Sequence, residues 1–261
     1  MRRIRIVGLC LVAVFALSAV VATAAQAEFP EKFPAFAKCV KAKVKGKGRF
    51  NDKNCQVPNM GGKASGGFEL ESAAGTALTS KTTASTLVTP GIGIVKCKAG
   101  TDTGEITGEQ SGTDTVTFTS CEVFGKKCTS EGQKEGTIKT FVLDTTLGFI
   151  NKEKGEVGVS LTGTGPGGLS AEFNCGGKFL VKTGGSVIGQ VTKDVNVSST
   201  SSTEIFKEVE GVQSPLSFEG GPEQRLETEF VTADPEVLFP SNETATATIK
   251  SKGAGEVVTK P

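Results

Sequence analysis

The sequence contains no histidine, no tryptophan and no tyrosine in its 261 residues. Without histidine, the chain lacks a Ser-His-Asp triad, a Cys-His nucleophile pair and a histidine zinc site. Without tryptophan and tyrosine, it also lacks the aromatic side chains on which sugar rings usually stack. Only carboxylates, lysine, serine and threonine remain for catalysis, and no strong nucleophile motif accompanies them. We therefore expect a protein that is not an enzyme and that carries no cofactor and no metal.

Long apolar runs are missing as well, except at the N-terminus. There the basic stretch "MRRIR" precedes "IVGLCLVAVFALSAVVA", and Ala25 and Ala27 form the A-x-A pattern of a signal-peptidase site. Residues 1–27 are expected to be a cleaved signal peptide, and the protein to be secreted and extracellular. A retained membrane anchor is the alternative. Because no later stretch approaches the ~20 apolar residues that cross a bilayer, we expect no membrane span after cleavage.

Cysteine is sparse, and its spacing argues against a metal site. In an exported chain, the six cysteines that follow the signal peptide indicate three disulfides. A zinc site would need CxxC-type spacing or histidine partners, and the sequence has neither. The disulfide cysteines are Cys39, Cys55, Cys97, Cys121, Cys128 and Cys175.

The alternation of side chains along strands predicts how these cysteines pair. Cys97 and Cys175 fall on the apolar faces of their strands, so we expect them to meet in the core. Cys121 follows "TVTFTS" on its threonine face, and we expect it to bond Cys128 across the turn "EVFGKK". Cys39 and Cys55 then pair by elimination.

No charge of one sign dominates, since the chain has 29 basic and 28 acidic residues and a formal net charge of +1. No global field attracts nucleic acid, and sequence-specific nucleic-acid binding is not expected. Basic character is local. The segment 39–55, "CVKAKVKGKGRFNDKNC", holds six basic residues and one acid.

Five of these basic residues occupy alternate positions: Lys41, Lys43, Lys45, Lys47 and Arg49. In an extended strand they line one face, and the glycines between them predict a bend. The simpler interpretation is a solvated edge strand whose lysines prevent edge-to-edge pairing. The alternative is a row that binds an anionic polymer of the cell envelope, or extracellular nucleic acid, through charge alone.

Short alternating runs between glycine-containing turns predict an all-β fold, an antiparallel sandwich or barrel. Thus "TVTFTSC" places Val116 and Phe118 on one face, and "EVGVSLTG" places Val157, Val159 and Leu161 there. We divide the mature chain into a disulfide-closed basic segment, 28–56, and a β domain, 57–261. Within the β domain, the chain from about residue 196 onward could form a separate C-terminal layer.

Near the N-terminus, "EFPEKFPAFAKC" contains three phenylalanines spaced four and three residues apart. Its prolines limit any helix to about one turn. We expect Phe29, Phe33 and Phe36 to plug one end of the β core.

Five blocks follow one another along the chain: "FPAFAKCVKAKVKGKGRFNDKNC", "VKCKAGTDTGEITG", "VTFTSCEVFGKKC", "AEFNCGGKFLVKTGGSVIGQV" and "FEGGPEQ". With these blocks in this order, the chain resembles a group of exported β-rich proteins from high-GC soil actinobacteria. The resemblance covers most of the mature chain and implies export and a β fold. The group has no established function, so the resemblance implies no catalytic residue.

Acidic residues supply the remaining candidates for chemistry. The segment "TDTGEITGEQSGTD" offers oxygens to calcium, but its spacing does not follow an EF-hand loop, and we interpret its acids as turn residues that favour solubility. Glycosidase-like carboxylate pairs would be Glu105 with Glu109, or Glu156 with Glu172. The expected function is that of a secreted, non-enzymatic β protein that binds a cell-envelope polymer or a partner protein. The alternative is a secreted carboxylate-dependent hydrolase.

Overall fold

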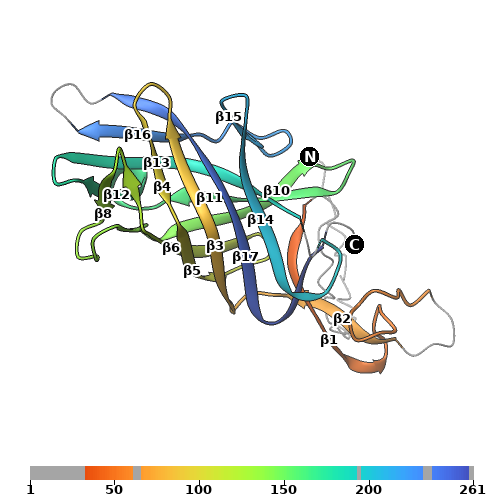
Figure 1. The fold of residues 1–261 in the computed structure, drawn as a ribbon. Coiled ribbons are helices and arrows are strands. Elements are labelled where there is room, and N and C mark those ends of the chain that lie inside the picture. The colour runs from red at the N-terminus through yellow and green to blue at the C-terminus, as the bar shows by residue number, and fades with distance from the viewer. Residues whose placement is uncertain (1–32, 61–65, 193–194, 232–236, 259–261) are drawn as a thin grey trace, which may run out of the picture.

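The computed structural model describes residues 33–60, 66–192, 195–231 and 237–258. The expected signal peptide, 1–27, and Phe29 lie outside these ranges. The described chain is all β, as predicted, apart from one 3-10 turn (Figure 1). The elements are β1 (Ala35–Gly46), β2 (Gly66–Ser72), β3 (Thr76–Thr89), β4 (Gly93–Cys97), β5 (Ala99–Ile106), β6 (Ser111–Thr119), β7 (Glu122–Val123), β8 (Lys126–Thr129), β9 (Thr137–Lys139), β10 (Leu143–Asn151), β11 (Glu156–Gly163), η1 (Pro166–Gly168), β12 (Leu169–Cys175), β13 (Phe179–Val191), β14 (Ser199–Val209), β15 (Val212–Ser214), β16 (Leu226–Val231) and β17 (Leu238–Val258).

Eight antiparallel strands close on themselves, which selects the barrel from the two expected architectures. This first ring runs β3–β5–β6–β10–β11–β13–β14–β17 and returns to β3. Its members follow one another in chain order, so each strand pairs with the ring strand before it in the sequence. A ring of about eight strands encloses just enough space for side chains or for one small ligand.

A second ring continues the first along three shared strands. It runs β3–β4–β7–β8–β12–β13–β16–β17 and also returns to β3. The shared strands β3, β13 and β17 are long enough to serve both, at 14, 13 and 21 residues. The insertions between first-ring strands therefore build the second ring.

Gly185 lies where β13 passes from one ring to the other. Its φ is 81°, and a Cβ atom there would lie 2.1 Å from the carbonyl oxygen of Arg225. Only glycine adopts this conformation at such a close approach without strain. The change of sheet within β13 thus depends on this residue.

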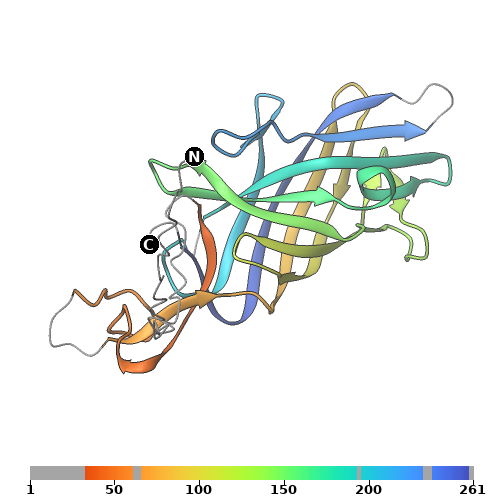
Figure 2. The ribbon, with the colours of Figure 1, turned by 180° about the vertical axis from the view of Figure 1, so that it is seen from behind.

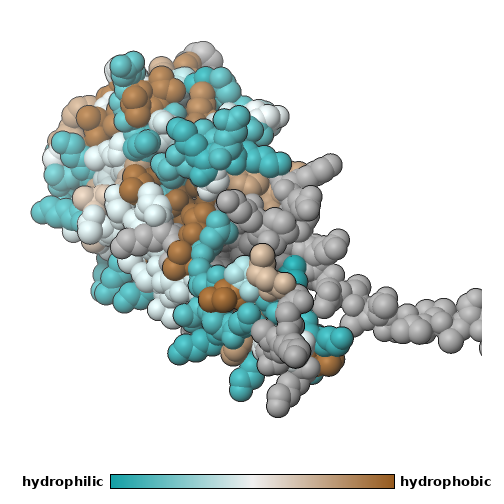
Figure 3. All heavy atoms as spheres, turned by 90° about the vertical axis from the view of Figure 1, so that its right-hand side faces the viewer, coloured by the Kyte–Doolittle hydropathy of each residue, from teal (hydrophilic) through white to brown (hydrophobic). Residues whose placement is uncertain are grey.

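The N-terminal strand closes one end of the first ring (Figure 2). β1 pairs with β2 and with the last part of β17, and the N–H of Phe36 donates to the carbonyl oxygen of Glu109 at 2.7 Å. Phe36 lines the ring's interior, as the predicted plug requires, whereas Phe33 is 53% exposed. Figure 3 views the molecule from this side, where hydrophilic side chains surround smaller apolar areas.

Cys39 and Cys55 are bonded to each other, as predicted. The bond lies beside a small apolar cluster formed by Ala35, Ala37 and Leu70, where Cys55 is buried. The disulfide therefore fixes the end of the basic segment to the β1–β2 hairpin, where both pack on this small apolar cluster.

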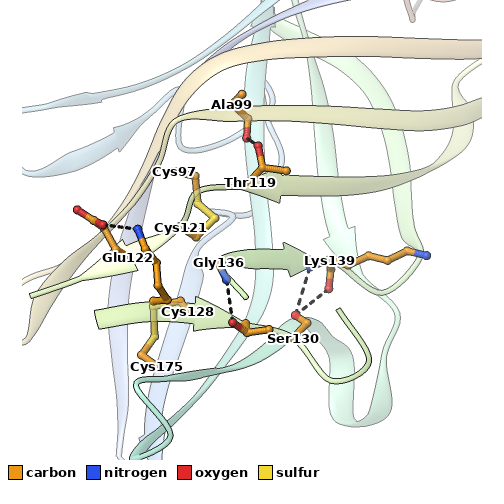
Figure 4. The surroundings of a disulfide bond; sticks show 12 residues. Cys97, Ala99, Thr119, Cys121, Glu122, Cys128, Ser130, Gly136, Lys139 and Cys175 are labelled. Atoms are coloured by element: carbon orange, nitrogen blue, oxygen red, sulfur yellow. Dashed lines mark hydrogen bonds and ion pairs between the residues drawn. A yellow bond between two sulfur atoms is a disulfide. The ribbon is translucent and has the colours of Figure 1, made fainter. Parts of the chain in front are cut away.

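The other two disulfides correct the predicted pairing (Figure 4). Cys97 is bonded to Cys121 and Cys128 to Cys175, so the predicted Cys97–Cys175 and Cys121–Cys128 pairs are wrong. The error lay in the face assigned to Cys121. Ser120 has a φ of 56°, which interrupts the alternation of the strand and turns Cys121 into the core, where it is completely buried.

The four cysteines form one row across neighbouring strands of the second ring. The N–H of Cys128 donates to the carbonyl oxygen of Cys121 at 3.0 Å, and Cys175 is directly opposite Cys128. Cys97 and Cys175 are therefore three strand spacings apart, about 14 Å, which exceeds the ~7 Å between Cα atoms that a disulfide spans. Three disulfides in one chain indicate an oxidising compartment outside the cytoplasm.

Among the described residues, no helix is long and apolar enough to cross a membrane.

Candidate functional site

The first ring contains a partly open cavity of about 250 Å³. Space remains inside because β5 and β17 turn small residues inward, among them Gly104 and Ala247. Apolar side chains form much of the cavity wall: Phe36, Leu78, Ile106, Val159, Leu161 and Val191. The wall is thus suited to an organic molecule smaller than those that fill pockets of ~300–1,000 Å³.

Three carboxyl groups from three strands line the same cavity. Asp102 belongs to β5, Asp114 to β6 and Glu204 to β14. Each shares its strand face with a buried apolar residue two or four positions away, as Asp114 does with Val116 and Glu204 with Phe206. The strand alternation that fills the core therefore also brings these acids inside.

Burial is the main cause of the shifted pKa values of these groups. It raises the pKa of Asp102 to about 6, against a hydrogen bond from Ser80 that favours the charged form. Burial, and then the charge of Asp102, raise the pKa of Asp114 to about 7, although the N–H of Thr115 donates to its Oδ1 at 2.8 Å. Because charging one carboxyl opposes charging the next, the three groups titrate as a coupled set.

Glu204 has the largest shift of the three. Burial raises its pKa to about 8, with further contributions from the charges of Asp114 and Asp102. Its carboxyl has no hydrogen-bond or ion-pair partner among the described residues. Of the three groups, Glu204 is therefore the most easily protonated and Asp102 the most easily charged.

A second, smaller cavity of about 100 Å³ lies where the two rings meet, since strands of both rings line it. Its wall is mainly apolar, and Glu243 contributes one carboxyl, whose pKa burial raises to about 7. With a single acid and little space, this cavity offers less for recognition than the first.

The predicted basic row lies on the free edge of β1. From Lys38 onward, the described part of β1 pairs only with β2, and the register shifts between Lys41 and Gly46, just before the glycines at which the bend was expected. Lys41, Lys43 and Lys47 are exposed, and the Nζ of Lys43 lies 3.6 Å from a carboxylate oxygen of Glu71.

The remaining members of the row differ from these three. Arg49 is half-buried, and its Nε is enclosed without a hydrogen-bond partner. The side chain of Lys45 lies outside the described residues. Of the five alternating basic residues in the sequence, Lys41, Lys43 and Lys47 are therefore the ones that the structure places in contact with solvent.

Of the candidate carboxylate pairs, the strand register separates Glu156 from Glu172. Glu156 begins β11 beside Val157, which is opposite Val191, whereas Glu172 is opposite Lys182. Nine residues of β13 separate Lys182 from Val191, which is about 30 Å of strand. Glu105 lines the rim of the first-ring cavity, and Glu109 lies in the turn after β5.

Sequence reasoning missed the inward position of the cavity acids. Asp102 and Asp114 were interpreted as turn residues, yet both lie within strands. The signal was available, since "TVTFT" had placed Val116 inward and Asp114 is two residues earlier. Glu204 has the same relation to Phe206 in "TEIFKEVE".

Comparison of the chain with protein-family models, with curated proteins and with solved structures finds no match.

Proposed function

We propose that this is an exported, non-enzymatic binding protein that holds a small ligand inside the first ring. The observation that carries the proposal is the cavity of the first ring, which combines an apolar wall with three carboxyl groups. The expected signal peptide and the three disulfides support export, in line with the resemblance to exported actinobacterial proteins.

The competing proposal is the carboxylate-dependent hydrolase. In its favour, Asp102 and Asp114 share one cavity and have pKa values of about 6 and about 7, a range suited to acid–base catalysis. Against it, the cavity is too small for a polymer chain, and β1 lies across its end. Turnover of a polysaccharide, peptide or ester that Asp114→Asn abolishes would favour the hydrolase.

A second binding role belongs to the edge of β1. Lys41, Lys43 and Lys47 are exposed there, and binding of an anionic cell-envelope polymer through charge alone is the role they support. This role is independent of the cavity, because these side chains point to solvent.

The cavity proposal is tested by saturation-transfer NMR on the disulfide-bonded protein. The compounds are small cationic, neutral and anionic molecules of up to roughly ten non-hydrogen atoms, in keeping with the small cavity. Val159→Phe fills the cavity from β11, and Ser202→Leu fills it from β14. Thr162→Phe adds the same ring as Val159→Phe at an exposed position of β11 and is the matched control.

We expect at least one compound class to bind the native protein and the Thr162→Phe control and to lose its signal with both cavity-filling variants. If no compound distinguishes the native protein from the filled variants, the cavity is not a ligand site. Circular dichroism and thermal unfolding of each variant ensure that loss of signal reflects a filled cavity in a folded protein.

A further inference from the structure

We propose that the ligand of the first-ring cavity is a small organic cation, of the alkylammonium type, whose charged head lies among the three carboxyl groups. This inference rests on the proposed cavity function and specifies the chemistry of the ligand. Its alkyl part would lie against the apolar wall formed by Leu78, Ile106 and Val159.

The first argument is the charge of the cavity wall. Asp102, Asp114 and Glu204 converge from three strands, and the described lining residues of β3, β10, β11, β13 and β17 are uncharged. Lys38 on β1 and Glu105 at the rim are the other charged residues of the described lining. No lysine is among the causes of the shifted pKa values of the three acids, so Lys38 does not act as their ion-pair partner. Carboxylates in such a cavity are costly unless they are paired, and a cation that enters supplies a charge partner.

The second argument is the state of Glu204. Glu204 is half-buried and lines the cavity, and no described residue donates to its carboxyl or pairs with it. A carboxylate only accepts hydrogen bonds, so its oxygens remain available to a donor that enters the cavity. An ammonium group is a strong donor of suitable charge, and it fits the space that Glu204 faces.

The third argument distinguishes an organic cation from a metal ion. Among the residues that the structure describes, no three acidic, cysteine or histidine side chains are close enough to hold one metal ion. The cavity acids are instead distributed around a space of about 250 Å³. That arrangement suits a charge distributed over a head group with several N–H or C–H donors.

Binding of such a cation must displace protons. The raised pKa values of Glu204 and Asp114, about 8 and about 7, favour the protonated form of Glu204 and, in part, that of Asp114 at neutral pH. An ammonium head favours their charged forms and lowers those pKa values. Affinity should therefore rise with pH between about 6 and about 8, by at least roughly tenfold, with proton release on binding.

The experiment compares three ligands that share one alkyl chain: butylammonium, butanol and butyrate. Isothermal titration calorimetry on the disulfide-bonded protein, at pH 6 and pH 8 and in two buffers of different ionisation enthalpy, measures affinity and proton release together. Glu204→Gln removes the ionisable group, so that no charge can form when a cation binds, and its amide is close in size and polarity to a protonated carboxyl. Asp144→Asn removes one exposed charge from the outside of β10 and is the matched control.

We expect butylammonium to bind more tightly than butanol and butyrate, to release protons, and to lose at least tenfold in affinity in Glu204→Gln and not in Asp144→Asn. If butanol bound as tightly as butylammonium, or if Glu204→Gln bound butylammonium with unchanged affinity, the proposal of a cationic ligand would be wrong. The cavity would then still be a site for neutral molecules. Failure of butylammonium to bind at millimolar concentration would also overturn the proposal of a cationic ligand. The broader compound screen then decides separately whether the cavity binds anything.

Discussion

Gly104 on β5 lies directly opposite Asp114 on β6, and the missing side chain at Gly104 leaves the space beside that carboxyl. A Cβ atom at Gly104 would lie 2.5 Å from the carbonyl oxygen of Thr113 and 3.2 Å from Oδ1 of Asp114. The geometry of the cavity acids therefore depends on a residue that is itself without a functional group.

Gly104→Ala should accordingly destabilise the protein. Because the new methyl group meets backbone that cannot easily move, we expect a loss of about 1–3 kcal/mol in the free energy of unfolding, measured by denaturant titration. Gly67→Ala is the matched control, since a Cβ atom there meets nothing within 4 Å. Equal stability of both variants and the native protein would show that β5 and β6 are spaced differently from the structure described.

Non-reducing peptide mapping should yield Cys97–Cys121 and Cys128–Cys175 peptides. A Cys121–Cys128 peptide would contradict the row of cysteines across the second ring.

The Cys128–Cys175 disulfide closes a loop with a sequence separation of 47 residues, and replacing both cysteines with serine removes this constraint on the unfolded chain. By the chain-entropy model we expect a loss of about 4 kcal/mol, measured as the change in unfolding free energy.

Glu243→Gln should stabilise the protein, and more so at higher pH. Burial raises the pKa of Glu243 from 4.5 to about 7, so the folded state holds this proton at a pH where the unfolded state has lost it. The native protein therefore loses stability as pH rises from about 4.5 to about 7, and the variant does not. The gain above pH 7 should be up to about 3 kcal/mol.

Denaturant titrations of Glu243→Gln and of the native protein at pH 5 and pH 8 measure this difference. Glu210→Gln, at an exposed position in the turn after β14, is the control. A gain from Glu243→Gln that is the same at both pH values would mean that this carboxyl is solvated in the folded protein.

Changing Lys41, Lys43, Lys45 and Lys47 to serine should weaken binding to a teichoic-acid-like polymer. With at most about six phosphate contacts, binding by the native protein should also fall steeply between low and moderate salt. Co-sedimentation or calorimetry at two salt concentrations measures both effects. If both proteins bound the polymer equally, or if neither bound it at low salt, polymer binding would be excluded. The lysines would then serve only to prevent edge-to-edge pairing of β1.

Local alternation predicted much of the fold, because a strand with one buried face shows that face directly in its sequence. Val157 and Val159 of β11, and Phe173 and Cys175 of β12, are buried as their runs indicated. Closure of the rings was beyond local reasoning, since it requires β17 to pair with β3, more than 150 residues earlier. The first ring became visible only once that pairing was known.

The candidate site was harder to predict for a different reason. Acids between threonines and glycines are typical of solvated turns, and composition alone favours that interpretation for "TDTGEITGEQ". Asp102 departs from it because β5 extends from Ala99 to Ile106 and Ile106 is buried, which turns Asp102 inward. Likewise, one left-handed residue, Ser120, reversed the face of Cys121.

The titration of the cavity carboxyl groups tests the account most directly, because the proposed function and its ligand both depend on acids enclosed within the first ring. Carbon-13 NMR of the side-chain carboxyls, assigned through Glu204→Gln and Asp114→Asn, follows each group between pH 3 and pH 10. We predict midpoints of about 8 for Glu204, about 7 for Asp114 and about 6 for Asp102. Midpoints near 4 for all three groups, as for solvated carboxyls, would contradict the enclosed cavity.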